Sequence, residues 1–377
     1  MKVLAVIHTP KSPYSAVYLA YLSLVAPFEA AGHALSILAP EDLPALRRLH
    51  ARWYPLLFPW YVAAWLRRRP EYDLVSFHSY AGWLANLYGL YRGRTVTAFH
   101  GLEPLNYAEV QREMAHRGRP YRWRFRLLHG AIVPALIRLS CRRSALVLCL
   151  NKAERRLLVE SGWSDAARTV VVGHGVSDEF FLDRAYADRA RRLLFVGQWI
   201  PRKGGAYLAE ACAHLMRARP DLELSCVGTL VDPDVVLGDF APEIRARVTV
   251  HPQVPNERLP EHYAQADVFL FPSLVDGFGH ALLEAMASGL PIVTTPAGWA
   301  QDVLADGESC LLVPTRDADA LVRAVERLLD DAPLRSRLGR GAQASARAYH
   351  LDRVVADRLA ILQRLLPADT QPQPCAP

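Results

Sequence analysis

The sequence predicts an α/β protein of two domains, each a parallel β-sheet covered by helices on both faces. The first indication is the length of 377 residues, which suits two domains of about 150–200 residues each. The second is a series of short apolar runs with little polar/apolar alternation, which is typical of strands buried on both faces. The third is that helical patterns, for example at 17–31, 206–218 and 321–329, lie between most of these runs.

We expect six strands in each half of the chain. Several of the runs end on histidine, glycine, proline or serine, at the strand ends where α/β folds place their loops and ligands. The expected strands are 3–8, 35–39, 74–78, 95–100, 145–150 and 169–172, followed by 193–196, 222–227, 248–251, 268–271, 292–295 and 310–313.

The boundary between the domains is expected after the sixth strand, where two glycines and a charged stretch follow. We assign 1–178 to an N-terminal Rossmann-like domain and 179–350 to a C-terminal one. Residues 351–366 are expected to form a helix that packs back toward the N-terminal domain. The Pro-rich tail 367–377 is expected to be disordered.

The composition favours anionic ligands or surfaces. The net charge is +6, and only four of the 44 basic residues are lysines: Lys2, Lys11, Lys152 and Lys203. The six cysteines form no C-x-x-C pair, so we expect free, buried thiols in a reducing compartment. We find neither a signal peptide nor a run of about 20 apolar residues, and therefore expect a cytoplasmic protein.

Two N-terminal segments combine aromatic and basic residues. The segment 53–69 runs from Trp53 to Arg69, and the segment 117–126 runs from Arg117 to Arg126. One interpretation is ordinary packed helices with solvated basic edges. A second is contact with an anionic membrane or an acidic acceptor, which would make the protein peripheral on the inner membrane face. Binding of nucleic acid is the least favoured interpretation.

The strongest chemical signal lies in residues 271–291. A buried strand is followed by a loop with Gly277, Phe278 and Gly279, then by a short helix from His280. Such a loop can bring backbone N–H groups to an anion, and the helix N-terminus adds positive potential. Asp276 before the loop and Glu284 on the helix can accept hydrogen bonds from sugar hydroxyls. The pattern predicts a diphosphate site.

A second signal lies in residues 195–205, where another buried strand leads through a loop into a helix. Arg202 and Lys203 lie in that loop, where two cations can neutralise a diphosphate leaving group. Taken alone, this segment fits a phosphate site and a basic helix start equally well.

Together the two loops resemble the retaining nucleotide-sugar glycosyltransferases of family four. The resemblance rests on Val-Gly-x4-Arg-Lys-Gly at 196–204 and on the Pro-Ser-x-x-Asp-Gly-Phe-Gly-x4-Glu-Ala-Met-Ala-x-Gly-x-Pro pattern at 272–291. It implies the GT-B fold, with an acceptor-binding N-terminal domain and a donor-binding C-terminal domain. It covers most of the second half of the chain and only loosely matches the first.

The resemblance also implies roles for single residues. Lys203 and Arg202 would bind the donor diphosphate, and Asp276 the hydroxyls of the donor sugar. Glu284 would bind the ribose, and His100 would face the donor sugar. On the residues alone, His100 is equally a structural strand-end histidine. The expected catalytic residues are His100, Lys203 and Asp276, and the expected donor-binding residues are Gln198, Arg202, Lys203, Val254, Asp276, Gly277, Phe278, Gly279, His280 and Glu284.

Some positions depart from the family pattern. Asp276 replaces the usual glutamate, and Gln198 replaces the usual arginine after Val-Gly. The first loop, 9–15, has no glycine. These departures motivate one alternative, a non-catalytic sugar-nucleotide-binding scaffold. A sugar-nucleotide epimerase of the same fold is a further alternative.

No cofactor or metal is expected beyond a nucleotide-sugar donor, most plausibly a UDP- or GDP-sugar. The acceptor would be a glycan, a lipid-linked molecule or a small molecule. The Asp232-Pro-Asp234 motif resembles that of metal-dependent transferases of another fold, and we do not assign it a metal. No Gly-x-Gly-x-x-Gly follows the first strand, which disfavours a nicotinamide dehydrogenase.

Overall fold

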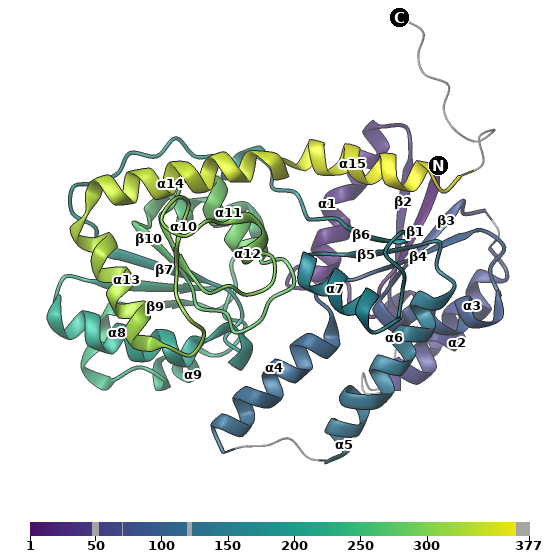
Figure 1. Ribbon diagram of the computed structural model, residues 1–377, viewed down its shortest axis with the longest axis horizontal. Helices are drawn as coiled ribbons and strands as arrows, with labels where there is room; N and C mark the ends of the chain where they lie inside the picture. Colours follow the sequence, from purple (N-terminus) through teal and green to yellow (C-terminus); the bar gives the residue numbers. More distant parts are fainter. Residues whose placement is uncertain (47–52, 70, 119–122, 367–377) are drawn as a thin grey trace, which may run out of the picture. The chain divides into compact units, whose positions relative to one another are not determined.

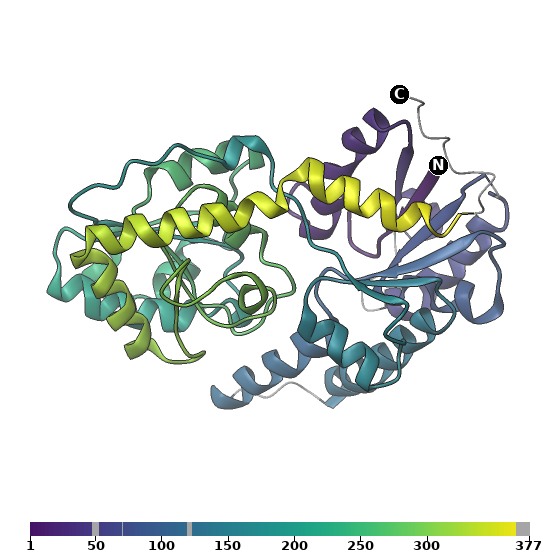
Figure 2. The same cartoon turned by 45° about the horizontal axis from the view of Figure 1, so that its top comes forward.

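The computed structural model describes residues 1–46, 53–69, 71–118 and 123–366; the tail expected to be disordered lies outside these ranges. The chain forms two compact units. Unit 1 comprises Met1–Tyr107, Tyr121–His174 and Asp352–Pro377, and unit 2 comprises Ala108–Pro120 and Gly175–Leu351. Figures 1 and 2 show the elements of each unit in two views.

Unit 1 contains a six-stranded sheet in which every neighbouring pair is parallel, as the unbroken apolar runs predicted. The order across the sheet is β2-β1-β3-β4-β5-β6. Its interior residues are almost fully buried, because helices cover both faces. The strands are β1 (Lys2–Val6), β2 (Ala34–Leu38), β3 (Leu74–His78), β4 (Arg94–Ala98), β5 (Leu146–Cys149) and β6 (Thr169–Val171).

The helices of unit 1 divide between the two faces of this sheet. On one face, Leu4 and Phe77 pack in a common core with Phe58 and Val62 of α2. On the opposite face, Tyr21 of α1 bonds to Ser76 of β3. The helices are α1 (Ala16–Ala30), α2 (Tyr54–Leu66), α3 (Trp83–Tyr88), α4 (Glu103–His116), α5 (Trp123–Leu127), α6 (Val133–Arg142), α7 (Lys152–Glu160) and α15 (Leu351–Gln363).

Unit 2 contains a second six-stranded parallel sheet, with the order β12-β11-β10-β7-β8-β9. Its largest core joins the sheet to α8 and α13. The strands are β7 (Arg192–Val196), β8 (Glu223–Val227), β9 (Val248–His251), β10 (Val268–Phe271), β11 (Ile292–Thr294) and β12 (Leu311–Leu312). The helices are α8 (Gly205–Ala218), α9 (Pro233–Gly238), α10 (Leu259–Gln265), α11 (His280–Ala287), α12 (Ala300–Val303), α13 (Ala318–Asp330) and α14 (Ala332–Ala346).

The strand orders locate the point in each sheet where the chain reverses its direction of progress. In unit 2 the chain runs from β7 outward to β9, then returns to place β10 on the other side of β7. In unit 1 it places β2 and β3 on opposite sides of β1. Loops diverge at such points beyond the carboxyl ends of the strands, and this is where open α/β sheets bind ligands.

The second half of α4 belongs to unit 2 because buried charges attach it there. The Glu113 carboxylate is fully buried, accepts a hydrogen bond from the Tyr207 hydroxyl at 3.1 Å and pairs with Arg316 at 3.2 Å. Arg316 also pairs with Glu109, one turn earlier on α4. A helix that begins in unit 1 therefore ends among residues of unit 2.

No helix in the described ranges is long and apolar enough to cross a membrane.

Candidate donor site

The two predicted loops of unit 2 lie at its chain-reversal point, one after β7 and one after β10. A backbone hydrogen bond of 2.7 Å from Leu274 N to Arg202 O joins them. Gly204 has a left-handed backbone (φ 75°), and a Cβ there would lie 2.0 Å from the carbonyl oxygen of Pro272. The approach of the two loops therefore requires glycine at this position.

The loops bring Lys203, Arg202 and Asp276 together. The Lys203 ammonium forms a hydrogen-bonded ion pair with Asp276, and Arg202 Nη1 lies 3.6 Å from the same carboxylate. Lys203 Nζ also lies 5.0 Å from the centroid of the Phe271 ring. Lys203 and Asp276 expose only 12% of their side chains, so this cluster is largely shielded from water.

The ionisation of this cluster reflects burial and charge together. Burial lowers the pKa of the Lys203 ammonium, and the neighbouring Asp276 charge offsets part of that effect. Burial alone would raise the pKa of Asp276, but Lys203, Arg202 and the Gly277 N–H, which donates to Oδ1 at 3.0 Å, lower it. Two cations thus face one carboxylate, which leaves a net positive charge for an anionic ligand.

The glycine loop leads directly into α11. Gly279 caps the helix in a left-handed conformation (φ 82°), and α11 begins at His280. The first N–H groups of a helix have no partners within it, so they can bind an anion. Burial lowers the pKa of His280 to about 4, which keeps this imidazole neutral. Phe278 stacks on Trp299, with ring centroids 4.2 Å apart, and this packing helps to hold the glycine loop in place.

Glu284 lies on α11, one turn past His280, and its carboxylate has an unusual environment. Burial raises its pKa to about 7. The buried Tyr263 hydroxyl donates a 2.7 Å hydrogen bond to Oε2, and Tyr263 also donates to the Ala281 carbonyl at 3.2 Å. Tyr263 therefore positions Glu284, a contact that the sequence analysis did not anticipate.

The remaining predicted residues of unit 2 lie in neighbouring loops. Gln198 follows β7 and is partly exposed. Val254 follows β9, which β8 and β7 separate from β10. Asp232 has a structural role, because its side chain caps α9 by accepting the Asp234 N–H at 2.9 Å. The described residues contain no cluster that could hold a metal ion.

The predicted residue His100 lies in unit 1, among histidines that the sequence analysis did not single out. Its ring lies 5.0 Å from that of His174 and 5.1 Å from that of His78. His78 stacks in turn on His8 at 4.5 Å. His78 ends β3, and the other three follow β1, β4 and β6, so all four share the carboxyl edge of the sheet. The signal was the recurrence of histidine at strand ends.

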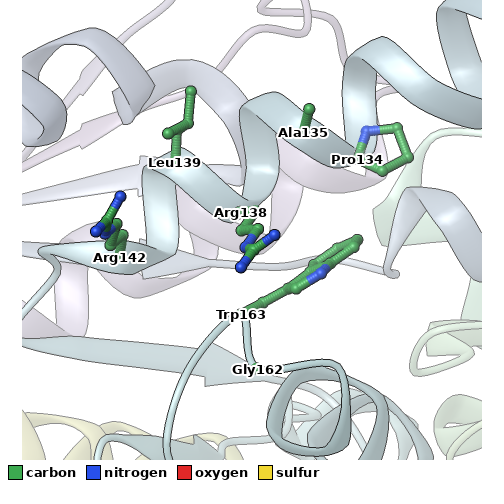
Figure 3. A pocket seen from close by; sticks show the side chains of 7 residues that line it. All are labelled: Pro134, Ala135, Arg138, Leu139, Arg142, Gly162 and Trp163. Carbon is green, nitrogen blue, oxygen red and sulfur yellow. The ribbon is translucent and has the colours of Figure 1, made fainter.

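Unit 1 also has an open cavity of about 640 Å³ between α6 and the turn after α7. Figure 3 shows its lining, with the Arg138 side chain extending toward Trp163. None of the predicted site residues lines it. The lining residues are Pro134, Ala135, Arg138, Leu139, Arg142, Gly162 and Trp163.

Two family models together match most of the chain. The model described as "Glycosyl transferases group 1" matches residues 190–331, and the one described as "Glycosyltransferase Family 4" matches residues 20–180. A D-inositol 3-phosphate glycosyltransferase of Streptomyces bingchenggensis is 30% identical over 345 residues, covering 85% of this chain and 71% of that protein.

A protein of the same name from Thermomonospora curvata is 34% identical over 238 residues, covering 56% of this chain and 55% of that protein. The chain thus spans about half the length of several curated relatives that it matches.

Solved structures with the same architecture match nearly the whole chain. Sucrose-phosphate synthase from Thermosynechococcus elongatus has a TM-score of 0.79 at 22% identity, covering 97% of this chain and 99% of that one. HepE from Anabaena, in complex with UDP, has a TM-score of 0.71 at 17% identity, covering 97% and 100%. At these identities the likeness establishes the fold.

Proposed function

The chain belongs to family four of the glycosyltransferases and has their GT-B fold, and from this we propose that it is a retaining enzyme that transfers a sugar from a nucleoside diphosphate to an acceptor hydroxyl. The observation that carries the proposal is the Lys203–Asp276–Arg202 cluster beside the N-terminus of α11, at the chain-reversal point of unit 2. Two cations and a helix N-terminus suit a diphosphate leaving group.

In the proposed mechanism the protein supplies positioning and charge stabilisation. Lys203 and Arg202 neutralise the diphosphate as the bond to the sugar breaks. The departing phosphate oxygen accepts the proton of the acceptor hydroxyl, which attacks the same face of the sugar and retains its configuration. Asp276 binds hydroxyls of the donor sugar, and the family resemblance makes His100 the unit 1 residue proposed to act on that sugar. No metal ion takes part, because side chains and N–H groups provide the positive potential.

We propose a UDP- or GDP-sugar as donor. The neutral His280 and the amides of Gly277, Phe278 and Gly279 would bind the phosphates and sugar, and Glu284 would bind the ribose. Gln198 and the backbone of Val254 would complete the donor contacts. The complex of HepE with UDP supports a UDP-sugar as the donor. The relatives named for D-inositol 3-phosphate support a hydroxylated, phosphorylated acceptor among the small-molecule, glycan and lipid-linked candidates.

A titration with UDP, GDP, ADP and TDP tests the donor site. We expect one nucleotide to bind the wild type, and Lys203→Ala to lose that binding. Turnover should fall by about 10²–10³-fold, the usual effect of removing one transition-state charge partner. Lys11→Ala is the matched control, because Lys11 forms a partly exposed ion pair with Asp42 in unit 1. Near-normal turnover of Lys203→Ala would refute the assignment.

The two departures Gln198 and Asp276 keep one alternative open, a scaffold that binds donor without transferring sugar. Such a scaffold would bind the nucleotide normally, but it would neither transfer the sugar nor slowly hydrolyse the donor. An epimerase would instead convert the donor with no acceptor present. Incubating each candidate donor alone and with polyol acceptors, followed by separation of the sugars, distinguishes the three activities.

We further propose that unit 1 contacts an anionic membrane at the cytoplasmic face. Helix α2 buries Phe58 and Val62 but leaves Trp60 58% exposed. Helix α5 exposes Trp123 (68%) and Leu127 (50%) beside arginines. Exposed tryptophan with neighbouring arginine is typical of interfacial helices. The segment 117–126 includes 119–122, which lie outside the described residues.

Co-sedimentation with phosphatidylglycerol vesicles at low salt tests this surface, with phosphatidylcholine vesicles as the neutral comparison. Trp60→Ser should weaken vesicle binding. Tyr88→Ser is the control, because Tyr88 is a similarly exposed aromatic residue at the C-terminal end of α3. Equal recovery with both vesicle types would contradict an electrostatic membrane contact.

A further inference from the structure

Arg358 of α15 carries a buried charge with almost no protein partner. Its residue is 7% exposed, and α15 packs it inward with Val355 and Leu359. Its Nη2 donates one hydrogen bond of 3.3 Å to the carbonyl of Gly173. Its Nε is buried and has no hydrogen-bond partner among the described residues.

Two other arginines, the buried Arg335 and the half-buried Arg184, show how a guanidinium is satisfied in this chain. Arg335 donates to four backbone carbonyls and has several aspartates nearby. Arg184 donates to three carbonyls and has Asp267 nearby. Arg358 has one carbonyl bond and no carboxylate partner in the described ranges.

An unpaired buried charge is costly, so such groups are normally paired or hydrogen-bonded. Burial lowers the pKa of Arg358, and within the described residues Tyr21 is the ionisable neighbour that counters this effect. The Tyr21 hydroxyl is already bonded to Ser76 at 3.3 Å, and burial raises the pKa of Tyr21, so it stays neutral. Among the described residues, therefore, none supplies an anion to Arg358.

The position of Arg358 is that of a ligand-binding group. Gly173, which it contacts, follows β6 and precedes His174. The His174 ring stacks on the His100 ring, and the ring centroids of Tyr21 and His100 lie 4.9 Å apart. Arg358 is thus hydrogen-bonded to the loop at the carboxyl edge of the unit 1 sheet, one residue before His174.

We propose that Arg358 anchors an anionic group, a phosphate monoester or diester, at the carboxyl edge of the unit 1 sheet. The planar guanidinium has donors left for a bidentate contact with phosphate oxygens. Identifying this phosphate as part of the acceptor rests on the function proposed above; the binding site itself does not.

The experiment measures phosphate binding by calorimetry and thermal unfolding in the Lys203→Ala background, which removes binding at the diphosphate site. The probes are inorganic phosphate, myo-inositol 1-phosphate, neutral myo-inositol and phosphatidylinositol vesicles, at constant ionic strength. Arg358→Met is compared with Arg353→Met, which removes an exposed arginine from the same helix. Arg358→Lys keeps the charge without the fork, and serves if the methionine variant does not fold.

We expect saturable binding of phosphate and inositol phosphate, weakened about 30-fold or more by Arg358→Met. Arg353→Met should bind normally, and Arg358→Lys should be intermediate. Without phosphate, Arg358→Met should unfold at an equal or higher temperature than its parent, because a buried unpaired charge has been removed. Preference for vesicles over free inositol phosphate would identify a lipid headgroup as the source.

Equal binding by the parent and Arg358→Met, or no binding by the parent, would overturn the inference. If Arg358→Met does not fold, unchanged binding by Arg358→Lys overturns it as well. The nucleotide titration of wild type is independent of this result. Phosphate binding at Arg358 without nucleotide binding would refute the donor site alone, and the reverse result would refute the phosphate site alone.

Discussion

The substitution Glu284→Gln should make the protein more stable at neutral and alkaline pH. Burial raises the pKa of Glu284 from 4.5 to about 7, so the folded state holds a proton on this carboxyl that the unfolded state releases at lower pH. Because the folded pKa is raised, the contribution of the Glu284 carboxyl to stability is fully present below pH 4.5 and is lost as the pH rises from 4.5 through 7. Glutamine removes this dependence and can still accept the Tyr263 hydrogen bond.

The size of the effect follows from the difference between the two pKa values. A difference of about 2.5 units corresponds to at most about 3 kcal/mol at pH above 7, since each unit is about 1.4 kcal/mol. The gain should shrink steadily between pH 7 and 4.5 and vanish below that window. Urea unfolding of wild type and Glu284→Gln at pH 5 and pH 8 measures it.

Nucleotide binding provides a second measure of the same group. If ribose hydroxyls donate to the Glu284 carboxylate, binding favours the ionised form, and near pH 7 it should release up to about half a proton from this group. Calorimetry in buffers of different ionisation enthalpy detects this release. Because the nucleotide phosphate also titrates, the quantity to compare is the difference between wild type and Glu284→Gln.

Two results would refute the reasoning. A stability difference that is the same at pH 5 and pH 8 would mean that the pKa of Glu284 is the same in the folded and unfolded states. Proton release that is identical in wild type and Glu284→Gln would mean that Glu284 does not bind the nucleotide as a carboxylate, whatever its effect on stability.

Two further predictions concern the glycine loop and the histidine cluster. Gly298→Ala would place a Cβ 1.8 Å from the Asp276 carbonyl oxygen, so nucleotide titration should show weaker binding, and urea unfolding should show a loss of stability above about 1 kcal/mol. Gly307 has an equally left-handed backbone but open space around it, so Gly307→Ala should leave nucleotide binding unchanged. Equal losses of binding in the two variants would contradict the steric argument. Burial lowers the pKa of His8 to about 4, so as the pH falls the unfolded protein binds a proton on His8 at a higher pH than the folded protein does. Up to about 3 kcal/mol of stability should therefore be lost as the pH falls from 6.5 to 4. Urea unfolding of His8→Gln should show a smaller acid loss than wild type, and an unchanged loss would contradict this.

The sequence predicted the fold well because its signals were local. Strands buried on both faces appear as unbroken apolar runs, and all twelve expected strands overlap an observed one. The meeting of Lys203 with Asp276 was predictable for the same reason, because both follow strands whose carboxyl ends lie at one edge of a sheet. The assigned roles of these residues in the reaction stay predictions.

The buried charges could not be predicted because their partners are distant in the sequence. Glu109 and Glu113 occupy helical positions that are usually solvated, and their unit 2 partners Tyr207 and Arg316 lie 94 to 207 residues away in the sequence. Arg358 equally resembles a surface arginine of an amphipathic helix. The histidine cluster depends on which strands are neighbours, which strand runs alone do not specify.

The descent of α15 into unit 1 has a consequence for how the chain folds as it is synthesised. The N-terminal strands emerge from the ribosome first, yet unit 1 is completed only by residues after 351. Until then the surface that receives Val355, Leu359 and Leu362 has nothing to cover it. Unit 2 can fold earlier than the unit that precedes it, and the nascent N-terminal half is the part most in need of chaperones.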